Sequence, residues 1–186
     1  MQPPSTTATT TGWCIPVANT KLTVRQIALY AMLAALTFAA KWAMSFLPNI
    51  EPVTLMVLIF GAVFGWKAVF PVYTYVAAEI LFYGLGEWNL FYLYIWLIPI
   101  GLGMLLRRSE QPLVWAMAAG FFGLAFGALC TPVHLLFGGP AYALAWWIDG
   151  IFYDLLHCAG NFVMALLLFA PLRNLLTKLY TRMRNK

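Results

Sequence analysis

The sequence predicts an all-α polytopic membrane protein with six transmembrane helices and both termini in the cytoplasm. Its 186 residues are 63% hydrophobic and only 9% charged, whereas about 25% of the residues of a soluble domain are charged. The mean hydropathy is +0.81. A soluble fold of this size could not hide so much apolar surface, so the chain is expected to lie in a bilayer.

Six apolar runs are separated by short segments rich in Pro, Gly or charge. A run of about 20 apolar residues is long enough to cross a bilayer, and the second run is short by this measure. We expect Gly138-Gly139-Pro140 to form a turn and Pro171 with Arg173 to end the last span. The predicted spans cover residues 24–46, 53–66, 68–83, 90–106, 113–137 and 142–170.

The domain organisation is one membrane domain, residues 21–179, between two tails. Residues 1–20 are uncharged, rich in Ser, Thr and Pro, and lack the basic and apolar regions of a signal peptide. We expect them to form a disordered cytoplasmic tail. Residues 180–186 are predicted to be a basic cytoplasmic tail.

The basic residues sort to one side of the predicted topology. Six spans place both termini on the same side, and that side receives ten of the eleven Lys and Arg residues. The opposite loops carry Glu51 and Glu87 and no Lys or Arg. The positive-inside rule therefore predicts cytoplasmic termini.

Several classes of function are not indicated. The basic residues form no patch with interleaved aromatics, so no nucleic acid is expected. The three Cys residues are scattered, which predicts neither a disulfide framework nor a zinc site. The chain has no phosphate-binding loop, nucleophile elbow or HExxH motif. No cofactor, metal or catalytic residue is predicted.

The first span carries alanines at a four-residue spacing. Ala31, Ala35 and Ala39 form overlapping small-xxx-small pairs, a spacing that lets another helix approach closely. This face could pack inside the protein or could dock another subunit.

Polar residues inside the predicted spans form two groups. Lys41 and Glu79 lie at similar depth near the outer surface, where they could pair, contact substrate, or leave Lys41 to extend outward. On the sixth span, Asp154, His157 and Asn161 share one helix face with Gly150. This stripe could be an interhelical hydrogen-bond network, the floor of a binding site or a proton relay.

The order of three segments resembles the substrate-binding S components of energy-coupling factor (ECF) transporters. These are residues 22–36 (LTVRQIALYAMLAAL), 47–52 (LPNIEP) and 152–161 (FYDLLHCAGN), and the resemblance covers about residues 22–179. It implies a multi-pass protein of a bacterial plasma membrane. Such a protein binds a vitamin or related micronutrient on the outer side and associates with a transmembrane T component and two ATPase subunits. It is not itself an enzyme, because the ATPase subunits hydrolyse ATP.

The resemblance also implies roles for individual residues. Ala31 and Ala35, with Ala39 as an extension, map onto the docking face for the T component. The aromatic, polar-rimmed outer side would suit a flat ring system such as a corrinoid. The implied substrate-binding residues are Asn49, Glu51, Glu87, Trp88, Asn89, Tyr92, Trp96, Trp146, Asp149 and Tyr153.

Two other functions remain open. The chain could be a self-sufficient proton-coupled carrier that uses Asp154 and His157. It could also be an intramembrane enzyme with His157 as the base, although no nucleophile or metal set stands near that residue in the sequence.

Overall fold

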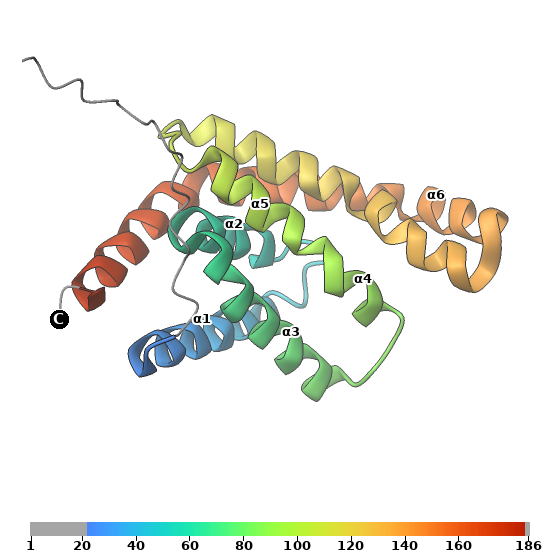
Figure 1. The fold of residues 1–186 in the computed structure, drawn as a ribbon. Coiled ribbons are helices and arrows are strands. Elements are labelled where there is room, and N and C mark those ends of the chain that lie inside the picture. The colour runs from blue at the N-terminus through green and yellow to red at the C-terminus, as the bar shows by residue number, and fades with distance from the viewer. Residues whose placement is uncertain (1–21, 185–186) are drawn as a thin grey trace, which may run out of the picture.

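The computed structural model describes residues 22–184, which fold into helices joined by short connections (Figure 1). The predicted tail over residues 1–20 lies outside the described residues. The prediction of an all-α fold is confirmed for the described part. Its elements are α1 (Val24–Ala43), α2 (Val53–Phe64), a short 3-10 helix η1 (Gly65–Ala68), α3 (Val69–Tyr83), α4 (Trp88–Ile95), α5 (Leu97–Leu106) and α6 (Pro112–Arg184).

Four helical segments are long and apolar enough to cross a membrane. They are Val24–Ala43, Val53–Tyr83, Trp88–Leu106 and Pro112–Arg184. Large apolar side chains also cover the outside of the protein: Leu81 is 88% exposed, Leu136 83% and Leu105 77%. An apolar exterior of this kind suits lipid and not water. The structure therefore supports a membrane protein built from several apolar helices.

Helix α1 begins at a capping box. The Thr23 side chain accepts a hydrogen bond from the Gln26 backbone N–H, and the Gln26 side chain accepts one from the Thr23 N–H. Such reciprocal bonds satisfy two backbone donors that have no partner inside the helix. The Gln26 amide also donates to the Tyr180 hydroxyl at 3.3 Å. This bond brings the start of α1 to the end of α6.

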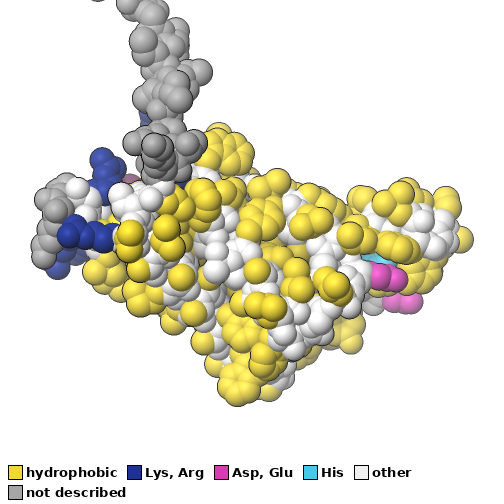
Figure 2. Space-filling view, turned by 60° about the horizontal axis from the view of Figure 1, so that its bottom comes forward, with side chains coloured by type: hydrophobic (Ala, Val, Ile, Leu, Met, Phe, Trp, Pro, Cys, Tyr) yellow, Lys and Arg dark blue, Asp and Glu magenta, His cyan; other side chains and the backbone are white. Residues whose placement is uncertain are grey.

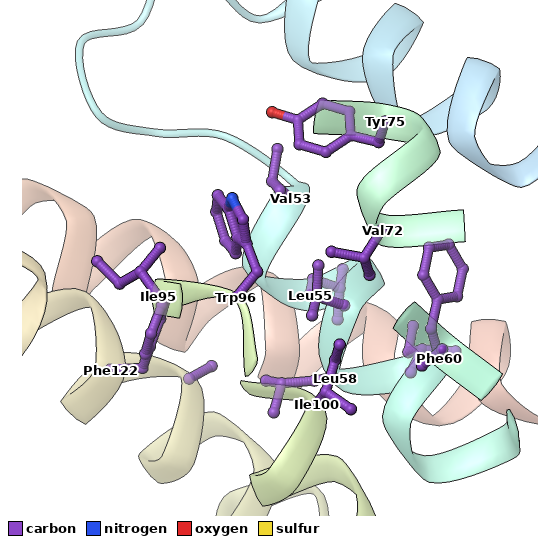
Figure 3. Packing of buried hydrophobic residues seen from close by; sticks show 14 of the residues in the cluster. Val53, Leu55, Leu58, Phe60, Val72, Tyr75, Ile95, Trp96, Ile100 and Phe122 are labelled. Carbon is purple, nitrogen blue, oxygen red and sulfur yellow. The ribbon is translucent and has the colours of Figure 1, made fainter. Parts of the chain in front are cut away.

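Helix α2 lies at the centre of the protein. Nine of its twelve residues are buried, and they pack against α5 and α6 (Figure 3). Two glycines permit a very close crossing of α2 and α5. A Cβ atom at Gly61 would overlap the Ile100 carbonyl oxygen, and one at Gly103 would overlap the Leu58 carbonyl oxygen. The backbones therefore touch at this crossing.

Helix α6 folds back on itself at the predicted Gly-Gly-Pro turn. Gly139 has φ 75° and ψ −179°, a conformation that side-chain-bearing residues rarely adopt. The two arms, residues 112–138 and 140–184, run antiparallel (Figure 1). Far from the turn, the Trp115 and Phe169 rings still stack with centroids 3.8 Å apart. The arms thus pack along most of their length.

One predicted helix boundary is wrong, and one predicted span is divided. Residues 90–106, expected as one span, lie within the apolar segment Trp88–Leu106, which divides into α4 and α5 at Trp96. Pro99 explains this break, because it has no N–H to donate to the carbonyl four residues earlier. Pro171 does not end the last helix, which continues to Arg184. Arg173 just beyond it donates to the carbonyl oxygens of Arg107 and Ser109, and these bonds hold the continuing helix in place.

Charge is distributed unevenly along the molecule. Figure 2 shows Lys and Arg side chains at the end where α6 terminates, and Asp, Glu and His side chains at the opposite end of this face. Hydrophobic side chains cover the surface between them. The contact of Tyr180 with Phe64 (4.9 Å between centroids) places the ends of α2 and α6 together at the basic end. We call the other end the acidic end.

Candidate functional site

The centre of the candidate site is a triad of charged residues where the end of α1 meets α3. The Lys41 ammonium lies 2.7 Å from a Glu79 carboxylate oxygen and 3.7 Å from a Glu51 carboxylate oxygen. Lys41 comes from the last turn of α1, Glu79 from α3, and Glu51 from the loop between α1 and α2. Of the arrangements expected for Lys41 and Glu79, the structure therefore has the ion pair, and it adds Glu51.

Burial differs among the members of the triad. The Glu79 side chain is 2% exposed, whereas those of Lys41 and Glu51 are about one-fifth exposed. The second carboxylate oxygen of Glu79 is buried and has no hydrogen-bond partner among the described residues. A buried carboxylate oxygen without a partner is costly. Glu79 therefore retains an unused acceptor within the protein.

Aromatic rings form one wall of the triad. The Lys41 ammonium lies 6.0 Å from the Tyr75 ring centroid and 5.7 Å from that of Tyr92, which is cation–π geometry. Trp96 continues the wall, with its centroid 5.2 Å from Tyr92 and 6.4 Å from Tyr75. Trp88 lies 5.2 Å from Tyr92 on the other side. Of the predicted substrate-binding residues, the structure thus gathers Glu51, Trp88, Tyr92 and Trp96.

Polar atoms on this wall point toward the α1–α2 loop. Figure 3 shows the Tyr75 hydroxyl and the Trp96 indole nitrogen on the side of the core where this loop reaches Val53. Both atoms are buried, and neither has a hydrogen-bond partner within residues 22–184. The wall therefore offers unsatisfied polar atoms as well as ring faces.

The α1–α2 loop, residues 44–52, encloses a small cavity beside the triad. The cavity volume is about 200 Å³. Asn49 has a positive φ of 53°, a conformation that Asn tolerates better than most residues. Ile50 anchors the loop on α6, because a Cβ at Gly160 would come within 3.2 Å of two of its side-chain carbons. The cavity is lined by Lys41, Met44, Ser45, Leu47, Pro48, Asn49, Ile50, Glu51 and Tyr83.

The loop carboxylate is electrostatically perturbed. Burial raises the pKa of the Glu51 carboxyl above its ordinary value, and the nearby charge of Lys41 opposes that rise. Glu79 adds to the rise, because a second negative charge disfavours ionisation of the first. Glu51 therefore holds its proton more firmly than a free glutamate, and a nearby positive charge favours its ionised form.

A second aromatic cluster lies at the tip of the α6 hairpin. The His134 ring stacks on Trp146 with centroids 3.9 Å apart, and its Nδ1 lies 3.7 Å from Glu87. Asn89 is buried and accepts a hydrogen bond at 2.6 Å from the Gly86 N–H, which lies just before the start of α4. The predicted residues Glu87, Asn89 and Trp146 therefore take part in local contacts here.

Two predicted substrate-binding residues point outward. Asp149 is exposed and Tyr153 is 49% exposed on the second arm of α6. The buried face of this arm carries Asp154, His157 and Asn161. Since residues one position apart differ by about 100° around a helix, Asp149 and Tyr153 lie off that face.

The buried stripe of α6 holds the two arms together. Asp154 accepts a hydrogen bond from the Gly127 N–H at 3.0 Å. Asn161 donates to the Thr54 hydroxyl at 3.2 Å and to the Ala119 carbonyl at 3.4 Å. The His157 ring lies 4.9 Å from Phe126, and neither of its nitrogens has a partner among the described residues. The stripe is therefore partly a hydrogen-bond network and partly unsatisfied.

The small-residue face of α1 is not used inside the chain. Ala31, Ala35 and Ala39 are all exposed, whereas Tyr30 and Ala34 are buried. Of the two interpretations of this spacing, internal packing is therefore not seen within the described residues.

The sequence analysis did not predict several residues that contact the candidate site. Tyr75 is fully buried against the triad, and its position four residues before Glu79 on the same helix could have indicated a shared face. The stacking of His134 on Trp146 depends on how the two arms of α6 are rotated against each other, which local sequence does not specify. Within residues 22–184, no group of three or more His, Cys, Asp or Glu side chains is placed to bind a metal ion.

Neither a protein-family model nor a curated protein sequence nor a solved structure matches the chain.

Proposed function

We propose that the chain is the substrate-binding membrane subunit of an ATP-driven transporter of the energy-coupling factor type. In this proposal it binds a vitamin-like micronutrient at the acidic end and delivers it with a T component and two ATPase subunits. The membrane would be a bacterial plasma membrane. The support is the sequence resemblance together with the geometry of α1 and of the triad.

The exposed alanine face carries the proposal. A helix that exposes Ala31, Ala35 and Ala39 on one side while burying Tyr30 and Ala34 on another offers a flat surface to a partner helix. Small residues let helix backbones approach closely in a membrane, where packing drives association. A T component is the partner that the resemblance supplies for this surface.

The distribution of charge supports the proposed topology. If η1 and the Gly139 turn each lie at a membrane surface, the four apolar segments make six crossings. The basic end would then face the cytoplasm by the positive-inside rule. The triad and its cavity would open toward the outer side, where a binding subunit meets its substrate.

The docking surface is tested with bulky substitutions. The tagged chain is purified from its own host in gentle detergent, and its partners and any bound small molecule are weighed by native mass spectrometry. Wild-type protein should carry a second membrane protein and two ATPases. Ala31→Trp with Ala35→Trp should lose them, whereas Ala159→Trp, at an exposed alanine of α6, should keep them. A double variant that assembles normally would refute the docking surface.

A second candidate function is a self-sufficient proton-coupled carrier. The observation that favours it is that one Asp154 carboxylate oxygen and both His157 nitrogens are buried without hydrogen-bond partners among residues 22–184. This function requires uptake driven by a pH gradient in liposomes that contain the chain alone, and loss of that uptake in Asp154→Asn. Uptake that needs ATP and partner subunits would exclude it.

A further inference from the structure

The charged triad is not electrically balanced. One ammonium group, that of Lys41, faces the two carboxylates of Glu51 and Glu79 at 3.7 and 2.7 Å. The second oxygen of Glu79 remains buried and unpartnered among the described residues. A buried group of this kind is normally satisfied by a donor or a positive charge. The site therefore lacks one hydrogen-bond donor, which a cation could supply.

The position of Lys41 shows where a positive charge is stabilised. Its ammonium lies over the rings of Tyr75 and Tyr92 while it touches Glu79. A carboxylate facing aromatic rings is the arrangement by which proteins bind organic ammonium ions. The unpartnered Tyr75 hydroxyl adds a hydrogen-bond acceptor on the same wall.

The cavity limits the size of the ligand. Its volume of about 200 Å³ is below the range of roughly 300–1,000 Å³ that is common for drug-sized ligands. It adjoins both Lys41 and Glu51, so a small ligand there lies beside the unbalanced charge. One ring with a short substituent fits this volume better than the large ring system that the aromatic residues alone suggested.

The surroundings of the site also favour a cation. Glu51 and Glu87 lie in the loops that follow α1 and α3, and these loops carry no Lys or Arg. Figure 2 shows Asp and Glu side chains at the end of this face opposite to the Lys and Arg side chains. An acidic mouth raises the local concentration of cations and the rate at which they associate.

We propose that this site takes a small organic cation, either a protonated amine or a positively charged nitrogen heterocycle. The ligand lies in the cavity, with its charge beside Glu51 and its apolar part against Tyr83 and the loop. Glu79 and the Tyr75 and Tyr92 rings contact Lys41 and lie outside the cavity lining. The Lys41 ammonium lies near the same carboxylates and therefore competes with the positive charge of the ligand. This inference rests on the proposed function, since it names the chemical class that the binding subunit would carry.

Two isosteric probes test the charge preference. Full-length protein in nanodiscs is titrated with benzylammonium and with neutral benzyl alcohol, and quenching of tryptophan fluorescence is followed, with protein-free nanodiscs as the blank. Benzoate serves as the anionic probe. We expect benzylammonium to bind at least about tenfold more tightly than benzyl alcohol, because only the cation gains the carboxylate and ring-face contacts.

Substitutions of the two glutamates and of Lys41 should change the affinity for benzylammonium in opposite directions. Glu79→Gln and Glu51→Gln should each weaken benzylammonium binding by about tenfold, because each removes one negative charge near the ligand. Lys41→Gln should strengthen it, because a competing cation is removed. Glu110→Gln removes a carboxylate from the basic end and should change nothing. Thermal unfolding of each variant shows whether it is folded.

A purely structural ion pair gives a different pattern. It would make Lys41→Gln and Glu79→Gln equally harmful to every probe. That result overturns the proposal, as does binding of benzyl alcohol or benzoate as tight as that of benzylammonium, or no saturable binding of any probe to folded protein. Failure of the proposed function is separate: the chain would still prefer the cation but would purify without T component and ATPases.

Discussion

Replacement of Lys41 by Met should destabilise the protein strongly. The ammonium lies 2.7 Å from the Glu79 carboxylate, so at an effective dielectric constant of about 20 their attraction is about 6 kcal/mol before desolvation is subtracted. Loss of one partner leaves Glu79 charged, 2% exposed and without its cation. Such a change typically costs about 3–5 kcal/mol, and we expect a loss in that range.

A second substitution separates the ion pair from simple packing. Lys41→Met combined with Glu79→Met removes both charges and replaces them with apolar side chains of similar length. Replacing a whole buried ion pair in this way is often neutral or stabilising. The double variant should therefore recover most of the free energy of unfolding that Lys41→Met loses.

The assay is a double-mutant cycle in detergent micelles. Unfolding by a chemical denaturant is followed by circular dichroism for the wild type, both single variants and the double variant. Lys178→Met, at an exposed lysine of the basic end, is the control and should change the free energy of unfolding by less than about 0.5 kcal/mol. If the two single effects simply add in the double variant, Lys41 and Glu79 are not coupled and the reasoning is wrong.

The same unfolding assay tests three further substitutions. Gly61→Ala should lower the free energy of unfolding by about 1–3 kcal/mol, because its Cβ would overlap a carbonyl oxygen of α5. The control Gly101→Ala should be harmless, because no atom lies within 4 Å of a Cβ at that position. Equal effects of the two substitutions would contradict the close crossing of α2 and α5. Gly127→Ala should likewise destabilise the protein by about 1–3 kcal/mol, because the added Cβ would displace the Asp154 carboxylate. The control is Gly150→Ala, since a Cβ at Gly150 meets no atom within 4 Å. Unchanged stability of Gly127→Ala would refute the contact between the arms. His157→Leu should be neutral or stabilising by up to about 1 kcal/mol, because it removes two buried nitrogens without partners; a large loss would show that the imidazole has a partner.

The fold class followed from composition, but helix boundaries depended on local chemistry and on tertiary contacts together. The start of α1 is encoded locally, because Thr23 and Gln26 supply a complete capping box. The end of the last helix is not. Pro171 normally interrupts a helix, yet the contacts of Arg173 with the loop before α6 and of Tyr180 with α1 keep the chain helical beyond it.

Part of the candidate site could be found by counting residues. Lys41 and Glu79 lie at similar distances from the predicted outer ends of their spans, and a rise of about 1.5 Å per residue therefore places them at one depth. The aromatic rings that surround Lys41 and Glu79 depend on how α3 and α4 pack, and local sequence does not predict this packing. Asp149 and Tyr153 lie off the buried face of Asp154, and helix phase alone predicts this separation.

Packing distinguishes the two polar clusters of the interior. Along the α6 hairpin, a Cβ at Gly123 would lie 2.8 Å from the His157 backbone, and one at Gly127 would overlap the Asp154 carboxylate. At these two positions the space between the arms does not admit an additional methyl group, so no ligand fits there. The triad instead adjoins a cavity of about 200 Å³ and carries an unbalanced negative charge. This packing favours the triad over the hairpin stripe as the place of the proposed binding function.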